Sequence, residues 1–325
     1  MRTSHVGSFP LTYSRENIAR VLRDLHSIGL DVPPYPQLRS FIDIYLKPLE
    51  DLGIVYSKRG FYFSTPRNLE VSPPRIRVED AEVAIEVISR EKLVFKGLRS
   101  PITGVFTLAS RLYLDENISK GLQATALAHR DIVEGFFKEF VAGLARYMRS
   151  LGYTVIFFDE PSLTLFIGRR VLYGWSEESV IEVLSHVARA AGDAEVGVHV
   201  CGQVNPKIIE ILARVDKVKY LNFEFYSTPT NIELINREVL EKCDKFIAPG
   251  VASTKSVNVE SVDEILTLLR KVYEKAGGRI DLISADCGFG GLRGALGNEE
   301  QEYKVSIEKL KNIVEAVKIF ERRGS

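Results

Sequence analysis

A histidine and a cysteine lie two positions apart at the end of an apolar run, in the segment GVHVCG (197–202). Side chains two apart on a strand point to the same side, so His199 and Cys201 can bind one ion. Glu224 and Cys287, which end two later apolar runs, would add an oxygen and a second sulfur. Together these atoms form a reasonable tetrahedral set for zinc. Alternatively, the cysteines are small buried apolar side chains and His199 hydrogen-bonds to the backbone.

These ligand types favour one chemistry over others. Hydrolytic zinc is usually held by histidines and a carboxylate, which leave it acidic enough to ionise water. Two thiolates donate more charge and weaken that acidity, yet the ion can still deprotonate a bound thiol, whose ordinary pKa is about 8.5. The pattern therefore favours alkylation of a thiol. Cys243 follows a predicted helix, apart from the other candidates, and is interpreted as a packing residue.

The elements that must position these residues alternate along the chain. Continuous apolar runs fit strands that are covered on both faces, and strand–helix alternation predicts a parallel sheet. We expect strands at 153–161, 195–202, 218–226, 245–251 and 279–288, with earlier candidates at 3–10, 92–98 and 102–108. Helices are predicted at 120–151, 176–192, 206–215, 236–243, 260–278 and 299–322.

About eight strands in 325 residues indicate a (β/α)8 TIM barrel that forms a single catalytic domain over 1–325. Residues 30–75 are interpreted as an insertion between early strands, and 53–65 within it as a β-hairpin. A doubly wound open sheet is the main alternative, but no G-x-G-x-x-G follows the first strand. In a barrel, reactive groups belong at the carboxyl ends of the strands, where these candidates lie.

The composition narrows the function classes. The formal net charge is zero, so nucleic-acid binding has no electrostatic support. The first ten residues lack the apolar run of a signal peptide, and no stretch approaches the roughly 20 apolar residues of a membrane span. We therefore expect a cytoplasmic protein that does not bind a membrane, with its three cysteines unpaired.

Several segments resemble, in order, the catalytic barrel of cobalamin-independent methionine synthase. They are TSHVGSFP, PITGVFTL, FFDEPSL, HVC, NFEF, GV with SVNV, and DCGFGGL. The resemblance runs from about residue 3 to the C-terminus and is diffuse between motifs. The length matches a short, single-barrel archaeal type.

The resemblance implies a zinc-dependent methyltransferase that makes methionine from homocysteine. Carried over by position, His199, Cys201, Glu224 and Cys287 are the zinc ligands. Ser8 would bind the amino-acid end of homocysteine, and Asp159 would pair with its ammonium group. Alternatively, Ser8 is a turn residue and Asp159 caps a helix ahead of Pro161. Glu160 and His5 are further candidates for the substrate site.

Two departures from the family pattern affect these expectations. The stretch GLDVPPYPQLR (29–39) lacks the family's substrate-binding Glu, for which Gln37 is the conceivable substitute. Lys255 stands where the family has a catalytic histidine. A lysine is a fixed cation unless burial lowers its pKa, so Lys255 would steer a negative donor or leaving group. Alternatively, it is an exposed loop residue.

The methyl donor is the least defined part of the prediction. Arg111, in the segment after PITG, and Arg75 are candidates for contacts to an anionic part of the donor. The altered donor side favours a methyl-corrinoid, free or carried on a partner protein, or a methylated pterin. Alternative functions are methyl transfer to another thiol such as coenzyme M, porphyrin decarboxylation, which needs no zinc, and a zinc-stabilised subunit of a methyl-transfer complex.

Overall fold

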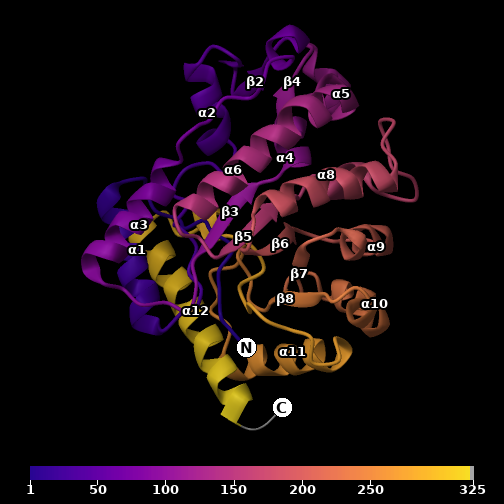
Figure 1. Cartoon of the computed structure of the whole chain (residues 1–325). Helices are drawn as coiled ribbons and strands as arrows, with labels where there is room; N and C mark the ends of the chain where they lie inside the picture. The colour runs from indigo at the N-terminus through magenta and orange to yellow at the C-terminus, as the bar shows by residue number, and fades with distance from the viewer. Residues whose placement is uncertain (323–325) are drawn as a thin grey trace.

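A parallel five-stranded sheet lies at the centre of the molecule, whose computed structural model describes residues 1–322 (Figure 1). Its strands lie in the order β3 (Arg99–Thr103), β5 (Val155–Asp159), β6 (Glu195–Val200), β7 (Val218–Glu224) and β8 (Phe246–Gly250). The strands run in sequence order with helices between them, as in successive βαβ units.

Three extended segments complete the ring through single bridges instead of ladders. Strand β8 bridges to residues 280–284, and Ile283 of that segment bridges to Thr3. Ser4 then bridges to Val32, and Pro34 bridges to Arg99 at the start of β3. These contacts give eight strand positions around one axis. The predicted (β/α)8 arrangement is therefore confirmed, although the hydrogen-bonded ladders join only five of the positions.

The helices surround the ring (Figure 1). Five of the described α-helices start at a side chain that accepts a hydrogen bond from the first turn, and two of these, Ser176 and Ser261, form capping boxes. The α-helices are α1 (Arg15–Ile28), α2 (Asp43–Asp51), α3 (Glu79–Glu91), α4 (Val105–Arg111), α5 (Arg130–Ile132), α6 (Lys138–Ser150), α7 (Leu163–Phe166), α8 (Glu177–Ala190), α9 (Pro206–Arg214), α10 (Arg237–Lys242), α11 (Val262–Lys275) and α12 (Glu299–Arg322). A π-helical turn, Val133–Phe137, joins α5 to α6, and 3-10 helices lie at Pro66–Leu69, Ile118–Ala124, Ala126–Ala128, Pro229–Leu234 and Phe289–Leu292.

Two of the three early strand predictions were wrong in position, whereas the segment 3–10 joins the ring through the bridges of Thr3, Ser4 and Ser8. Residues 92–98 form no strand, and Val94 in that run is 81% exposed. Residues 105–111 are helix α4, whereas the strand is Arg99–Thr103. A short apolar run fits a strand and a buried helix equally well, which explains the error. The segment 279–288 makes bridges without becoming a regular strand.

The predicted hairpin is confirmed as β1 (Tyr56–Lys58) and β2 (Phe61–Phe63), which pair in antiparallel fashion. Arg59 and Gly60 between them both have positive φ, as a tight two-residue turn requires. A short strand β4 (Leu112–Tyr113) pairs with β2, and this small sheet lies with α2 and α5 at one end of the molecule (top in Figure 1). The insertion begins later than predicted, because residues 32–37 belong to the ring.

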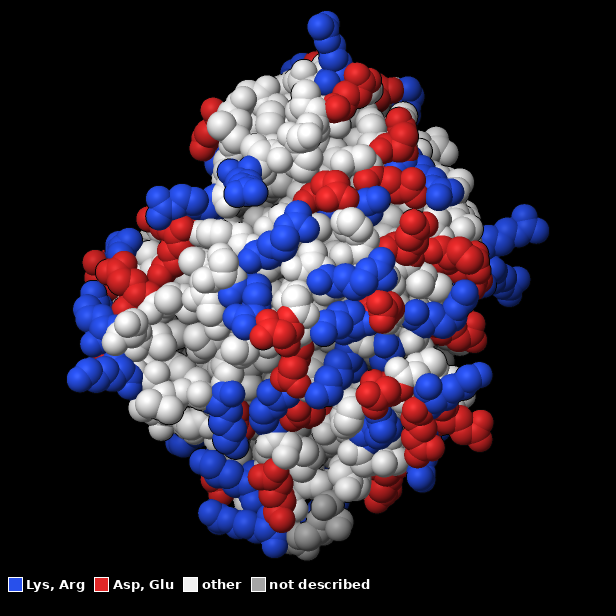
Figure 2. All heavy atoms as spheres, in the orientation of Figure 1, with Lys and Arg blue, Asp and Glu red and all other residues white. Residues whose placement is uncertain are grey.

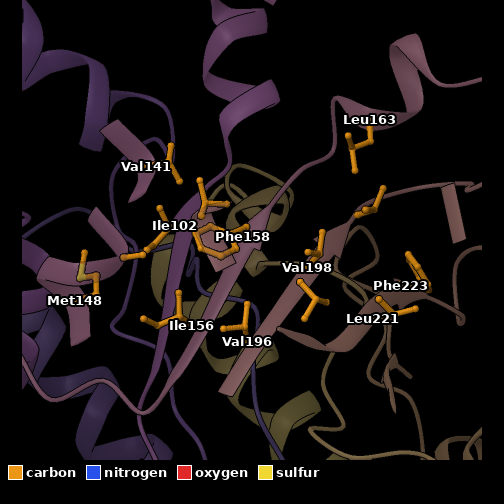
Figure 3. Close-up of a cluster of buried hydrophobic side chains, with 14 of the residues drawn as sticks. Ile102, Val141, Met148, Ile156, Phe158, Leu163, Val196, Val198, Leu221 and Phe223 are labelled. Atoms are coloured by element: carbon orange, nitrogen blue, oxygen red, sulfur yellow. The ribbon is translucent and has the colours of Figure 1, made fainter. Parts of the chain in front are cut away.

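The main apolar core lies between the outer face of the sheet and the helices. Outward-facing residues of neighbouring strands, such as Ile156, Phe158 and Val198, share this layer with Val141 and Met148 of α6 (Figure 3). A second, smaller cluster fills the inside of the ring and consists of Val32, Val155, Phe157, Tyr220, Ala248 and Leu282. Because side chains alternate along a strand, the residues in step with this inner cluster also point inward.

The outer surface carries both signs of charge. Basic and acidic side chains are interspersed over the face shown in Figure 2. This distribution agrees with the zero net charge of the chain. Within the described residues, no helix combines the length and the apolar character needed to cross a membrane.

Candidate metal centre

The alternation along β5, β6 and β7 places Asp159, His199 and Glu224 on the inner side of the ring, in step with the inner apolar cluster. Asp159 pairs with His199 in the β5–β6 register, and Glu224 pairs with Gly250 at the end of β7. All three stand at the carboxyl ends of their strands, which is the catalytic end of a (β/α)8 barrel.

Three of the four predicted metal ligands converge. The ligand atoms of His199, Cys201 and Cys287 all lie within 4.8 Å of one another. The Nε2 atom of His199 is 2.9 Å from the Cys201 sulfur, which is 2.9 Å from the Cys287 sulfur. We call these three residues the ligand cluster. One imidazole nitrogen and two sulfurs could hold a metal ion, and their chemistry suits zinc.

The electrostatics of the cluster favour a thiolate, which is the form that binds metals. The hydrogen bond from Cys201 lowers the pKa of Cys287 well below its ordinary value, and His199 adds to this effect although burial opposes it. The same hydrogen bond, with burial, raises the pKa of Cys201. One thiol therefore ionises readily, and a cation would stabilise the second thiolate.

The fourth predicted ligand, Glu224, lies beside the cluster but outside it. Its side chain is 1% exposed, and its Oε2 atom accepts hydrogen bonds from Lys255 Nζ and Thr228 Oγ1, both at 3.3 Å. Burial lowers the pKa of Lys255, but the Glu224 carboxylate and the two cysteines raise it by more. The net shift of the Lys255 pKa is therefore upward. Lys255 is therefore an exposed loop lysine, with its side chain 66% exposed, that also forms an ion pair with a predicted ligand.

A cavity of about 420 Å³ opens over these groups. Cys201, Cys287, Glu224 and Lys255 line it, so the ligand cluster is accessible from this space. The remaining lining residues are Arg111, Pro161, Ser162, Thr164, Leu165, Gly202, Thr254, Gly288 and Gly291. Such a volume fits a small ligand.

The two arginines predicted to contact the donor lie in different places. Arg111, the last residue of α4, lines the cavity with the two cysteines. Arg75 lines a separate cavity of about 490 Å³ between residues 72–76 and the outer side of α6. The prediction for Arg75 is therefore wrong in position, because the segment that carries it packs outside the ring.

Asp159 and Glu160 are neighbours in sequence with different surroundings. Asp159 is 6% exposed, its Oδ1 atom has no hydrogen-bond partner in the protein, and burial raises its pKa to about 7. Glu160 is fully buried and accepts hydrogen bonds from the amides of Phe106 and Thr107 and from the Thr107 hydroxyl, at 2.8–3.1 Å. Glu160 therefore holds the start of α4 and is not available to a substrate, contrary to the prediction.

Ser8 and His5 connect the first strand segment to the loop that follows Cys287. The Ser8 hydroxyl accepts a hydrogen bond from the amide of Gly290 at 3.0 Å. A side chain at Gly288 would place its Cβ 2.1 Å from this hydroxyl, so a glycine is required there. His5 is fully buried against Phe9 and Phe289. It was predicted to belong to the substrate site, but it does not line the cavity.

The sequence did not reveal the roles of two residues near the site, Asp286 and Arg99. Asp286 accepts hydrogen bonds from three successive amides just after Glu224: Phe225 and Tyr226 at 3.1 Å and Ser227 at 2.7 Å. Arg99 is fully buried, with its guanidinium 3.7 Å from the centre of the Phe157 ring. The signal for Arg99 is a charged residue at the start of an otherwise uncharged strand.

Comparisons with known proteins agree with this arrangement. Residues 73–318 match the family described as "Cobalamin-independent synthase, Catalytic domain". The chain is 27% identical over 323 residues to a methionine synthase of Methanothermobacter marburgensis, across 98% of this chain and 93% of the relative. It is 25% identical to a 5-methyltetrahydropteroyltriglutamate–homocysteine methyltransferase of Yersinia enterocolitica, across 84% of this chain but only 35% of that enzyme.

Solved structures show the same fold. A B12-independent methionine synthase from Shewanella sp. W3-18-1, in complex with selenomethionine, superposes with a TM-score of 0.70 at 17% identity, covering 99% of this chain and 98% of the other. A methyltransferase from Methanosarcina mazei superposes with a TM-score of 0.65 at 17% identity, covering 98% and 94%. At this identity the likeness concerns the barrel alone.

The family match and the named relatives thus define the class of the protein as a methyltransferase. The chain belongs to the cobalamin-independent methionine synthase family, through its catalytic domain.

Proposed function

We propose that this protein is a zinc-dependent methyltransferase that transfers a methyl group to the thiol of homocysteine and forms methionine. The observation that carries the proposal is the ligand cluster of one histidine and two cysteines, which faces a cavity of about 420 Å³. The methionine synthase of Methanothermobacter marburgensis, which the chain matches over nearly its whole length, supports the choice of acceptor.

Each residue of the site would have a separate role in the reaction. Zinc bound by His199, Cys201 and Cys287 would supply a thiolate at neutral pH. The acceptor thiol would release its proton to solvent, and its sulfur would form a bond to the methyl carbon while the bond between that carbon and the donor breaks, with the bonding electron pair leaving on the donor. Asp159, whose Oδ1 atom has no protein partner, is suited to pair with the substrate ammonium group. Ser8 would orient the other end of the amino acid.

The donor side is lined by cationic groups. Arg111 and Lys255 both line the cavity, and either could contact an anionic donor. We propose a methyl-corrinoid, free or bound to a partner protein, or a methylated pterin. The names of the Yersinia relatives specify a polyglutamyl pterin, but this chain spans about a third of those enzymes. The reaction would take place in the cytoplasm, where thiols stay reduced.

The test is a donor screen with the zinc-loaded protein and homocysteine. Methylcobalamin and methyltetrahydropterins with and without glutamate tails are supplied in turn, and methionine is measured. Formation of methionine from at least one donor is expected. Coenzyme M is offered as a second acceptor thiol, and exclusive methylation of coenzyme M would contradict the choice of homocysteine.

The metal assignment has its own test. Cys201→Ser and Cys287→Ser should each remove most of the bound zinc, because a serine hydroxyl is a poor ligand beside a thiolate. Cys243→Ser is the matched control, since Cys243 lies in a different cavity, with Lys217 and Lys245. Elemental analysis of the purified proteins measures the zinc. Full zinc content in both cluster variants would refute the assignment.

A further inference from the structure

A buried ion pair between Lys309 of α12 and Glu260 lies outside the residues assigned to the reaction. The Lys309 side chain is fully buried, that of Glu260 is 2% exposed, and Lys309 Nζ donates to both carboxylate oxygens, at 2.9 and 2.7 Å. Glu260 lies just before α11, which packs beside α12 (Figure 1). Burying two charges is costly, and apolar side chains of similar volume are often at least as stabilising. Stability alone therefore does not explain this pair.

The pair holds the connection between β8 and α11 at two points. Glu260 Oε1 also accepts a hydrogen bond from the amide of Ser253 at 3.0 Å, and Lys309 Nζ also donates to the carbonyl of Asn258. We call residues 253–259 the β8–α11 loop. Within the described part of the chain, no backbone–backbone hydrogen bond involves this loop. Side-chain contacts, those of the ion pair among them, therefore set its position.

The β8–α11 loop forms one wall of the cavity that contains the ligand cluster. Thr254 and Lys255 both line this cavity. Ser253, directly before them, organises the turn, because its Oγ atom accepts hydrogen bonds from the amides of Lys255 and Ser256, each at 3.2 Å. The carbonyl of Thr254 lies close to Gly291, where a Cβ would be 3.2 Å away. A displacement of Ser253 would therefore move both lining residues.

We propose that Lys309 and Glu260 are positioning residues that hold the β8–α11 loop against the cavity. Neither side chain lines the cavity, so both act through the loop. By fixing the loop, the pair sets where Thr254 and Lys255 meet the methyl donor. This last step rests on the function proposed above, whereas the hold on the loop does not depend on it.

The competing explanation is a purely structural role, in which the pair only fixes α12 to the barrel. Lys309→Met leaves a buried carboxylate without its counter-charge and should destabilise the protein. Lys309→Met combined with Glu260→Leu leaves neither buried charge and should recover most of the stability. Under a structural role, the loop would recover together with the stability. Under the proposal the loop stays released, because the Ser253 amide and the Asn258 carbonyl have both lost their partners.

The experiment measures amide hydrogen exchange of the full chain without substrates, and urea unfolding follows stability in parallel. In both Lys309→Met and the double variant, the β8–α11 loop should exchange at least about tenfold faster, since hydrogen bonds to charged groups are lost. Lys311→Met is the matched control, because this lysine lies on the same helix, is 60% exposed and pairs with Glu308 at 3.5 Å. It should leave loop exchange unchanged. Unchanged loop exchange in Lys309→Met, or normal loop exchange in the double variant, would overturn the proposal.

Kinetics test the step from loop position to donor binding, with the donor that yields methionine in the screen. In the double variant, the KM for this donor should rise about tenfold and kcat should change less than about twofold, because the displaced contacts are binding contacts. An unchanged KM with a released loop would overturn this step. If no donor yields methionine but loop exchange rises in both variants, the proposed function fails and the hold of the ion pair on the loop is supported.

Discussion

Replacement of Asp286 with alanine should destabilise the loop that follows Glu224. Both carboxylate oxygens of Asp286 accept hydrogen bonds from this loop, and the side chain is 1% exposed. The amide of Phe225 also donates to the Gly250 carbonyl at 3.1 Å, so it keeps a partner in the variant. The amides of Tyr226 and Ser227 have no second acceptor among the described residues.

The expected magnitude follows from these two amides. A hydrogen bond to a charged group contributes about 1.5–3 kcal/mol, and water can replace part of what the variant loses, because Tyr226 and Ser227 are exposed residues. Asp286→Ala should therefore lower the free energy of unfolding by about 1.5–3 kcal/mol. Asp286→Asn keeps one acceptor oxygen and should lose roughly half as much. Because the loop begins next to Glu224 and Asp286 precedes Cys287, metal affinity should also fall by about tenfold.

The assay is urea unfolding of the metal-free protein, followed by circular dichroism, with a chelator competition for metal affinity. Measuring the metal-free form separates loop stability from metal binding. A loss below about 1 kcal/mol in Asp286→Ala, which is typical of a substitution without a specific mechanism, would refute the reasoning. Equal losses in the alanine and asparagine variants would show that the acceptor oxygen is not the source of the effect.

Two further predictions concern the barrel away from the cavity. Burial raises the pKa of Glu195, but hydrogen bonds from basic and tyrosine neighbours lower it by more, from an ordinary 4.5 to about 2. The ionised side chain therefore contributes up to about 3 kcal/mol to the free energy of unfolding. This contribution is present above pH 4.5 and is lost as the pH falls towards 2. Glu195→Gln should remove this part of the acid sensitivity in urea unfolding curves measured at several pH values; an unchanged pH dependence would contradict it. Gly197→Ala should cost about 1–3 kcal/mol, because its Cβ would lie 2.3 Å from the Phe157 ring, whereas Gly143→Ala on α6 meets nothing within 4 Å and should be neutral or stabilising. Equal melting temperatures for the two glycine variants would show that the ring can move aside.

The second half of the fold could be predicted from the sequence because its strands are apolar and end in polar residues. β5 to β8 each lie within an expected run, and the spacing of His199 and Cys201 placed both side chains correctly on one side. The first half lacks this pattern. β3 contains Arg99 and Pro101, so it does not look like a buried strand, while the more apolar run before it is partly exposed.

One kind of error in the site comes from contact between residues far apart in the chain. Glu160 follows Asp159 directly, but the sequence does not reveal that the amides of α4, more than 50 residues earlier, occupy its carboxylate. The pairing of Lys255 with Glu224, 31 residues apart, is similar. The residue types predicted a ligand set, but only the structure shows which carboxylates have other partners.

The side chains inside the barrel change from apolar at one end to polar at the other. The polar end is where polar atoms are buried without hydrogen-bond partners. One end is filled by the inner apolar cluster around Phe157, and the other carries Asp159 and His199. Arg99 lies between them: its guanidinium stacks on Phe157, and its hydrogen bond to Asn222 is long, at 3.5 Å. Asp159 Oδ1 and His199 Nδ1 are buried without protein partners. Buried polar atoms are normally paired, so these two unpaired atoms at the mouth of the barrel are consistent with the ligand-binding roles proposed above, at the expense of stability.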